Sequence, residues 1–120
     1  MLVAIPAETP DGLAATRSGH FGHAPWFTLV TIEGDKCTKV EALKNVDHDV
    51  AGCGGVIDFA ISQGIDAIIV VGMGVPPFTR FTDAGIKVYV EQNQPYVGGA
   101  VTLFMRGALP EMQLDQACKH

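Results

Sequence analysis

The sequence predicts an α/β domain in which a five-stranded mixed sheet, with one antiparallel strand, is flanked by helices. The apolar run 67–71 ends at Gly72-Met73-Gly74 and is typical of a strand buried on both faces that enters a turn. Two further strand patterns flank a hairpin turn at Gly34-Asp35, and helix and strand patterns alternate after residue 55. A hairpin followed by alternating helices and strands indicates a mixed sheet covered by helices.

Size and composition indicate one domain. The chain has 120 residues, of which 48% are hydrophobic, enough to fill a single core. The formal net charge of -5 argues against a broad nucleic-acid-binding surface, and no apolar run is long enough to span a membrane. Three cysteines without a repeated spacing, and a start without a basic or long apolar segment, predict a cytoplasmic protein. We expect residues 1–109 to form the domain and residues 110–120 a C-terminal tail.

The first third of the chain is predicted to be rich in strands. Leu2–Pro6 is a short apolar run stopped by proline, which suits a strand in the middle of a sheet. Ala7–Ala24 has several glycines and little periodicity, and a loop of that length in a small domain is usually functional or mobile. Pro25–Glu33 and Lys36–Lys44 then form the two strands of the hairpin.

Helices and strands alternate in the remaining chain. Helical spacing of apolar residues predicts a helix over Val56–Gln63, and the glycine that follows suits its C-terminus. A short helix with phenylalanines at positions 78 and 81 follows the central strand, and a strand is predicted over Lys87–Glu91. From Val97, apolar residues recur at i, i+3, i+4 and i+7, which predicts an amphipathic helix that ends near Gly107.

The predicted strand directions bring four separate segments to one edge of the sheet. If the first strand runs up, the hairpin makes the second run down and the third up, and right-handed crossovers make the last two run up. The segments that meet at the upper edge are then Ala7–Ala24, Asn45–Gly55, Gly72–Pro77 and Gln92–Pro95. Open α/β sheets bind ligands at this edge.

The Gly72-Met73-Gly74 turn is the first candidate binding element. The prolines that follow suit the first turn of a helix, so the glycine peptides are predicted to lead into a helix N-terminus, which attracts anions. The alternative is that the glycines only allow a tight turn between strand and helix.

Cys53 is the second candidate, because it stands among Gly52, Gly54 and Gly55 ahead of the predicted helix. The field of a helix N-terminus favours a thiolate, which would make this residue a metal ligand, a nucleophile or a redox thiol. The alternative is a small residue buried in a tight turn.

Histidines and one arginine complete the candidate set. His20, His23 and His48 lie in the converging loops, where imidazoles together with a thiolate can bind a soft metal, although no pair has zinc-finger spacing. Each could instead be a hydrogen-bonding loop residue. Arg17 could lend positive charge to an anion or be a solvated side chain.

Several enzyme classes lack their motifs in this sequence. There is no Gly-x-Ser-x-Gly, no P-loop and no pair of carboxylates on the central strands, and the dinucleotide fingerprint lacks its third glycine. A metal-dependent nuclease needs clustered carboxylates, and Leu2–Pro6 contains none. We therefore expect a protein that is not an enzyme.

Several short blocks together resemble one known family. Ser18-Gly-His-Phe-Gly-His-Ala-Pro-Trp-Phe27 resembles the Ser-x-His-Phe-Gly-x-Ala-Pro-x-Phe signature of the dinitrogenase iron-molybdenum cofactor biosynthesis family, of the NifX and NifB C-terminal-domain type. The blocks 52–55, 64–74, 85–86 and 107–109 look like later blocks of that family in the same order. The resemblance implies a ribonuclease-H-like domain that carries or chaperones a metal–sulfur cluster.

Within that family the sequence looks most like single-domain members of sulfate-reducing bacteria that carry a molybdenum–copper sulfide cluster without covalent attachment. The resemblance implies such a cluster as the cofactor, with an iron-molybdenum cofactor precursor or an iron–sulfur cluster as alternatives, and possible contacts with other assembly proteins but not with nucleic acid or membrane. A protein that regulates or assists assembly without any cofactor is the alternative function.

Residue by residue, the match places His20, Phe21, Gly22, Cys53 and the 72–74 turn on the family pattern, whereas His23 occupies a variable position and Pro76-Pro77 departs from it. Metal contacts are expected at Cys53 and His20. The full set predicted to bind the cofactor is Arg17, His20, Phe21, Gly22, His23, His48, Gly52, Cys53, Gly54, Gly72, Met73 and Gly74.

Overall fold

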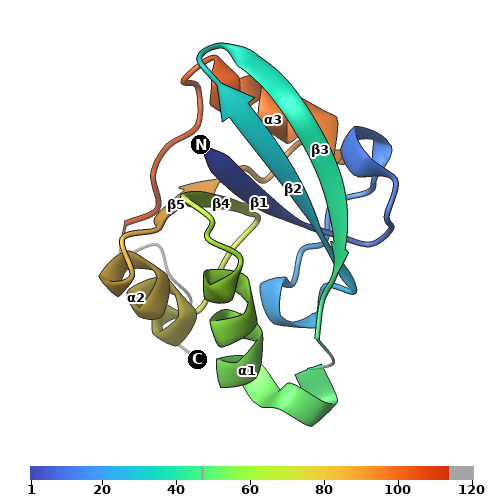
Figure 1. The fold of residues 1–120 in the computed structure, drawn as a ribbon. Coiled ribbons are helices and arrows are strands. Elements are labelled where there is room, and N and C mark those ends of the chain that lie inside the picture. Colours follow the sequence, from blue (N-terminus) through green and yellow to red (C-terminus); the bar gives the residue numbers. More distant parts are fainter. Residues whose placement is uncertain (47, 114–120) are drawn as a thin grey trace.

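The computed structural model describes residues 1–46 and 48–113, with the side chains of residues 1–46 and 54–113 (Figure 1). Its strands and helices are β1 (Leu2–Ala7), β2 (Trp26–Glu33), β3 (Lys36–Lys44), α1 (His48–Ser62), β4 (Ala67–Val70), α2 (Val75–Asp83), β5 (Lys87–Val90) and α3 (Val97–Met105). Two short 3-10 turns, η1 (Gly12–Ala14) and η2 (Phe21–His23), lie in the loop between β1 and β2. Within these residues, no helix is both long enough and apolar enough to cross a lipid bilayer.

The five strands form one mixed sheet in the order β3-β2-β1-β4-β5. β2 is antiparallel to both β1 and β3, whereas β4 is parallel to β1 and to β5. The left-handed conformation of Gly34, with φ of 65°, closes the β2–β3 hairpin, a backbone geometry that glycine adopts without strain. The predicted α/β class, the five strands and the single antiparallel strand are therefore confirmed.

Both faces of the sheet are covered, which explains why the central strands are almost entirely apolar. In β4, Ala67 and Ile69 face the cluster formed with α3, whereas Ile68 and Val70 face the cluster formed with α1 and α2. All four side chains are at most 1% exposed. Figure 1 shows α1 and α2 together on one side of the sheet and α3 on the other. A strand buried on both faces has no polar face, so its sequence is a continuous apolar run.

Helix α1 starts earlier than the sequence predicted. It begins at His48, not at Val56, so the glycines around Cys53 lie inside the helix and not in a turn ahead of it. Three helix glycines are unfavourable, each by roughly 1 kcal/mol relative to alanine. Val56, Ile57 and Ala60, which lie in the predicted part of the helix, are buried in the core cluster, and the helical backbone continues N-terminal to them despite its glycines.

The segment predicted to be a tail begins with ordered contacts. The N–H of Val90 donates to the carbonyl of Pro110 (3.1 Å), and the N–H of Met112 donates to the carbonyl of Val88 (2.7 Å). Residues 110–112 thus lie antiparallel along the outer edge of β5. Met112 is 5% exposed and belongs to the core cluster on the α1 and α2 side. The ordered structure therefore continues past residue 109.

Candidate functional site

The carboxyl ends of four strands meet at one edge of the sheet. Ala7, the last residue of β1, pairs with Trp26, which pairs with Lys44 at the end of β3. β4 is parallel to β1, and its last residue Val70 pairs with Val90 at the end of β5. The loops that leave these strands therefore share one edge, which confirms the convergence predicted from strand direction.

The η2 turn presents two histidines to solvent at this edge. Ser18 is buried, and its Oγ lies 3.3 Å from both the N–H and the carbonyl oxygen of His20. The N–H of His23 donates to the carbonyl of His20 (3.3 Å), which closes the turn. His20 and His23 are both exposed, and Gly22 between them is half-buried. Their imidazoles are accessible to a ligand.

Phe21 and Met73 anchor two candidate segments in the same part of the core. The Phe21 ring meets Phe81 of α2 edge to face, with ring centroids 5.3 Å apart, and lies 6.0 Å from the Phe27 ring of β2. Phe21 and Met73 are 6% and 4% exposed and belong to one apolar cluster. Their side chains therefore pack inward, where they hold the backbone of residues 20–23 and 72–74 at the edge. We call these two segments the rim.

Gly72 leaves open space above the rim. A Cβ atom built at this position meets no other heavy atom within 4 Å, and its φ lies outside the left-handed region. The fold could therefore accommodate alanine at position 72. The missing side chain leaves space above the backbone of Gly72, as a bound ligand close to the backbone would require.

The N-terminus of α2 offers fewer donors than the sequence suggested. Gly74 is the N-cap residue, and the first helical turn contains Pro76 and Pro77, which have no N–H. The N–H of Phe78 donates to the carbonyl of Gly74 (3.1 Å). In the first three helical positions, only Val75 therefore retains an amide that an anion can use.

Arg17 is buried and paired, whereas the sequence allowed a solvated side chain. Its Nη1 lies 3.1 Å from Oε1 of Glu91, just beyond β5, and 3.2 Å from the carbonyl of Gln94. The same Glu91 oxygen also accepts the N–H groups of Asn93 and Gln94, both at 2.6 Å. The side chains of the ion pair are 3% and 7% exposed. Glu91 thus joins the long loop to the end of β5.

Two nitrogens of Arg17 remain without a partner in the described part of the chain. Nε and Nη2 are buried and make no hydrogen bond there. Burial lowers the pKa of the Arg17 guanidinium below its usual value, and the neighbouring Glu91 carboxylate opposes this shift. Unused buried donors are costly unless a ligand or water meets them. Arg17 therefore has donor capacity to spare close to the binding edge.

Sequence reasoning did not identify two residues that position these loops. The Nδ2 of Asn45 donates to the carbonyl of Ala24 (2.8 Å), and its Oδ1 accepts the N–H of Val46 (2.8 Å). This buried side chain ties the end of the η2 loop to the segment before α1. Glu91 has an equivalent role beside Arg17. For Glu91 the available signal was a polar residue directly after an apolar strand, whereas Asn45 follows a mostly exposed strand and had no such signal.

The remaining candidates lie partly outside the described residues. The side chains of His48 and Cys53, like position 52, fall in the first turns of α1, where only the backbone is described. Gly54 is exposed in the same helix, which packs beside η2. Among the described residues, no group of three His, Cys, Asp or Glu side chains is placed to hold a metal ion. The predicted metal contacts at Cys53 and His20 stay predictions.

Comparison with known proteins decides the family. The sequence model described as "Dinitrogenase iron-molybdenum cofactor" matches residues 1–107. The chain belongs to this family. The match covers every strand and helix of the fold and ends before the segment that lies along β5.

Relatives of the family share the length and the fold of this chain. An uncharacterized protein of Methanocaldococcus jannaschii is 29% identical over 117 residues, which cover 94% of this chain and 92% of that protein. The crystal structure of a protein named PH0822 is 29% identical, with a TM-score of 0.78 and coverage of 93% of this chain and 96% of that chain. Both are similar over nearly their whole length.

The apo form of the orange protein from Desulfovibrio gigas has the same fold. It is 24% identical, with a TM-score of 0.78 and coverage of 92% of each chain. At this identity the likeness supports the fold alone. The resemblance to carriers of molybdenum–copper sulfide clusters therefore stays a prediction for this chain.

Proposed function

We propose that this protein is a non-catalytic carrier that binds an anionic metal–sulfur cluster at the rim. The guest is of the molybdenum–copper sulfide type, and it is held without covalent attachment by peptide N–H groups and imidazoles. An iron-molybdenum cofactor precursor or an iron–sulfur cluster would present a similar sulfide surface. Membership of the dinitrogenase iron-molybdenum cofactor family supports a role in handling such clusters.

The observation that carries this proposal is the common anchoring of the two rim segments. Phe21 and Met73 point into one apolar cluster, so the polar atoms beside them are left at the surface of one edge. Residues 20–23 contribute exposed imidazoles, and Gly72 leaves open space above its backbone. Sulfide ligands accept weak hydrogen bonds from peptide N–H groups, and imidazole is a suitable ligand for copper.

The local charges also suit an anionic guest. His20 is exposed and can donate a hydrogen bond, and the buried Arg17, two of whose nitrogens have no partner among the described residues, adds positive charge near this edge. The carboxylate closest to Arg17, Glu91, is already neutralised by it. An anion at this edge therefore meets hydrogen-bond donors, and the negative charge of Glu91 is offset by its ion pair with Arg17.

Reconstitution tests the proposal directly. We expect purified protein incubated with thiomolybdate and a copper(I) salt to retain molybdenum and copper through gel filtration and to develop a visible absorption band. His20→Ala should lower metal retention several-fold without changing the fold, because it removes an exposed ligand. Cys53→Ser tests the remaining predicted metal contact in the same assay.

Lys36→Ala is the matched control, because it removes an exposed basic group at the hairpin end of the sheet, opposite the rim. It should leave retention unchanged. A wild-type protein that stays colourless and metal-free after reconstitution would overturn the carrier proposal and favour a cofactor-free assembly partner. Equal loss of metal in His20→Ala and Lys36→Ala would exclude the rim as the site.

Gly72→Ala separates a binding role for this glycine from a structural one. Because a Cβ meets open space there, we expect the free energy of unfolding to stay the same or to rise by about 0.4–1 kcal/mol. Cluster retention should nevertheless fall, because the methyl group would cover the peptide surface of the turn. The measurements are urea unfolding and bound metal after gel filtration. Lower stability together with unchanged retention would show that the glycine serves only the turn.

A further inference from the structure

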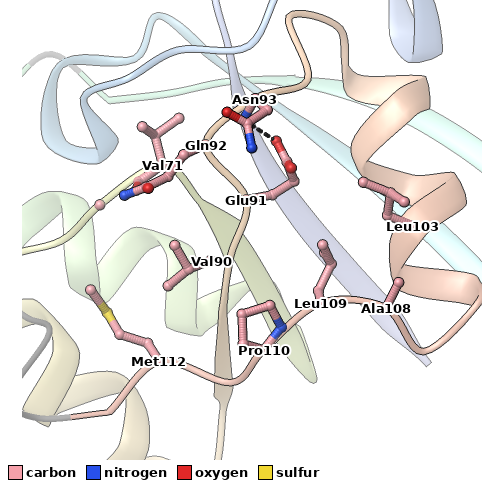
Figure 2. Close-up of a pocket in the computed structure, with 11 residues that line it drawn as sticks. Val71, Val90, Glu91, Gln92, Asn93, Leu103, Ala108, Leu109, Pro110 and Met112 are labelled. Carbon is pink, nitrogen blue, oxygen red and sulfur yellow. Dashed lines mark hydrogen bonds between the residues drawn. The ribbon is translucent and has the colours of Figure 1, made fainter.

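One outer edge of the sheet is covered by the chain itself, and the other is open. At β5, the N–H of Val90 donates to the carbonyl of Pro110 (3.1 Å), and Met112 bonds to this strand in the same way. Figure 2 shows Pro110 and Met112 beside Val90. At the opposite edge, β3 pairs with β2 alone in the part of the chain that the structure describes (Figure 1). An open edge presents N–H and carbonyl groups to another strand.

The open strand is long and has an apolar side chain at its centre. β3 has nine residues, of which Cys37 and Leu43 are half-buried and the others are exposed. Val40 at the centre is 36% exposed. The η1 turn lies against it, since a Cβ built at Gly12 would lie 3.3 Å from Cγ1 of Val40, and Leu13 of this turn is 40% exposed. A long exposed edge with an apolar centre favours association with another chain.

The backbone groups that β3 turns outward follow from the register of the sheet. Ile32 and Met1 exchange both backbone hydrogen bonds (2.8 and 3.0 Å), so Ile32 turns its N–H and carbonyl towards β1. These directions alternate along a strand, so the odd-numbered residues of β2 turn theirs towards β3. Their partners in β3 are residues 39, 41 and 43. The N–H and carbonyl groups of Val40 and Ala42 therefore point away from the sheet.

Charge selects one register for an antiparallel pair of two β3 strands. Outward-facing residues must lie opposite outward-facing residues, so Val40 can lie opposite Thr38, Val40 or Ala42 of a second copy while most of the strand stays paired. The first register places Lys39 opposite Lys39 of the second copy, and the third places Glu41 opposite its own equivalent. Only the second places each Lys39 opposite a Glu41. Like charges directly opposite each other destabilise a strand pair, and opposite charges stabilise it.

We propose that β3 is a dimerisation site for a second copy of this chain, with the two strands antiparallel about a two-fold axis at Val40. On one face of the joined sheet Val40 packs against its equivalent, and on the other face two ion pairs form between Lys39 and Glu41. A two-fold axis uses the same surface on both subunits, which this strand provides. The rims lie at opposite ends of the joined sheet, so the dimer goes beyond the proposed cluster function and does not need a cluster.

The ends of β3 limit the strength of this pairing. In the same register Lys36 lies opposite Lys44 of the second copy, and the pairing of β3 with β2 shifts register between Thr31 and Ile32. Lysines and bulges protect exposed edges from open-ended association. We therefore expect a reversible dimer whose population depends on protein concentration.

Sedimentation equilibrium measures the dissociation constant of the dimer. Lys39→Glu and Glu41→Lys each place like charges opposite each other, and each should raise this constant by at least about tenfold. Each also breaks the exposed ion pair between these residues within one chain (3.1 Å). A one-to-one mixture of the two variants separates the effects, because opposite charges face each other again in the heterodimer while the ion pair within each chain stays broken. The mixture should associate as tightly as the wild type.

Two further variants make the same change of charge elsewhere. Lys87→Glu is the matched control at an exposed residue of β5, and it should leave the dissociation constant unchanged. Lys44→Glu should lower it, because the new carboxylate lies opposite Lys36 of the second copy. A wild-type chain that stays monomeric up to about 1 mM would overturn the proposal. So would a dimer that neither charge reversal weakens, or a mixture that associates no better than the single variants. None of these results bears on metal retention, which tests the carrier proposal separately.

Discussion

Two parts of the loop between β1 and β2, Arg17 and residues 20–23, are held in place by different interactions. Near its middle, Arg17 is fixed by a buried ion pair with Glu91 and by its own N–H, which donates to the carbonyl of Pro95 (2.9 Å). Further along, residues 20–23 are fixed by the Phe21 ring in the apolar core. The polar groups of Arg17 lie inside the protein, where Nη1 is paired with Glu91 and two other nitrogens have no partner among the described residues, whereas the histidines of the rim lie at the surface.

This difference separates stability from binding within one loop. A residue whose polar atoms are used internally contributes to folding, and its loss leaves a partner unsatisfied. A residue whose apolar neighbour provides the anchor keeps its polar atoms for a ligand. A substitution at Arg17 should therefore change mainly the stability, and one at an exposed rim residue mainly the binding. The following three predictions test this difference, from the largest expected effect on stability to the smallest.

Arg17→Met should have the largest effect on stability. Removing one partner of a buried ion pair typically costs about 3–5 kcal/mol, because the other charge stays buried without compensation. Here the Glu91 carboxylate, 7% exposed, would lose its cation. The free energy of unfolding from urea titration is the measurement.

The double variant Arg17→Met/Glu91→Gln provides the control for this interpretation. The glutamine carbonyl oxygen can still accept the N–H groups of Asn93 and Gln94, but it carries no charge. We expect the double variant to recover part of the lost stability. A double variant as unstable as the sum of both single variants would show that the two side chains do not act as a pair.

Met73→Ala should have the next largest effect on stability and should also lower cluster retention. A large-to-small change at a buried methionine costs roughly 2–5 kcal/mol, depending on how far the cavity collapses. Because this side chain anchors the 72–74 turn, the turn should also lose its position, and cluster retention should fall. Met73→Leu keeps most of the volume and should cost less than about 1.5 kcal/mol. A stable Met73→Ala protein with full retention would show that the turn is positioned by other contacts.

His20→Ala should change stability least. The side chain is exposed, and the hydrogen bonds of this residue with Ser18 use backbone atoms that alanine keeps. Surface substitutions of this kind stay within about 0.5 kcal/mol of the wild type. Urea unfolding of His20→Ala beside Arg17→Met makes the comparison quantitative. A loss near that of Arg17→Met would mean that the imidazole serves the fold and not the rim.

Much of the fold followed from the pattern of apolar residues. The run at 67–71 and the hairpin around Gly34 determined the strands, and counting directions placed the loops at one edge. These features are local or follow from general rules of chain connection. The rim segments were selected as candidates from the sequence, because histidines and glycines in unpatterned segments stand out, and their role as a site stays a prediction. The inward packing of Phe21 and Met73 was not predicted, since both side chains were expected to contact the ligand.

Other features depend on residues that are distant in sequence. The partners Arg17 and Glu91 are separated by 74 positions, and no local signal links them. The early start of α1 runs against the low helix propensity of its glycines, and no local pattern predicts it. Residues 110–112 along β5 are similar, because a short segment with one buried methionine has no periodic pattern. These features became visible only when the partners were seen together.

The pair Pro76-Pro77 has a consequence for the lifetime of any complex at this edge. Two successive rings without N–H groups lower the number of donors that the start of α2 can offer to a sulfide surface. Fewer donors mean a shallower energy well and a faster dissociation rate, while the on-rate changes little. Under the proposed carrier function, these prolines would change how soon a bound cluster leaves and not whether it binds.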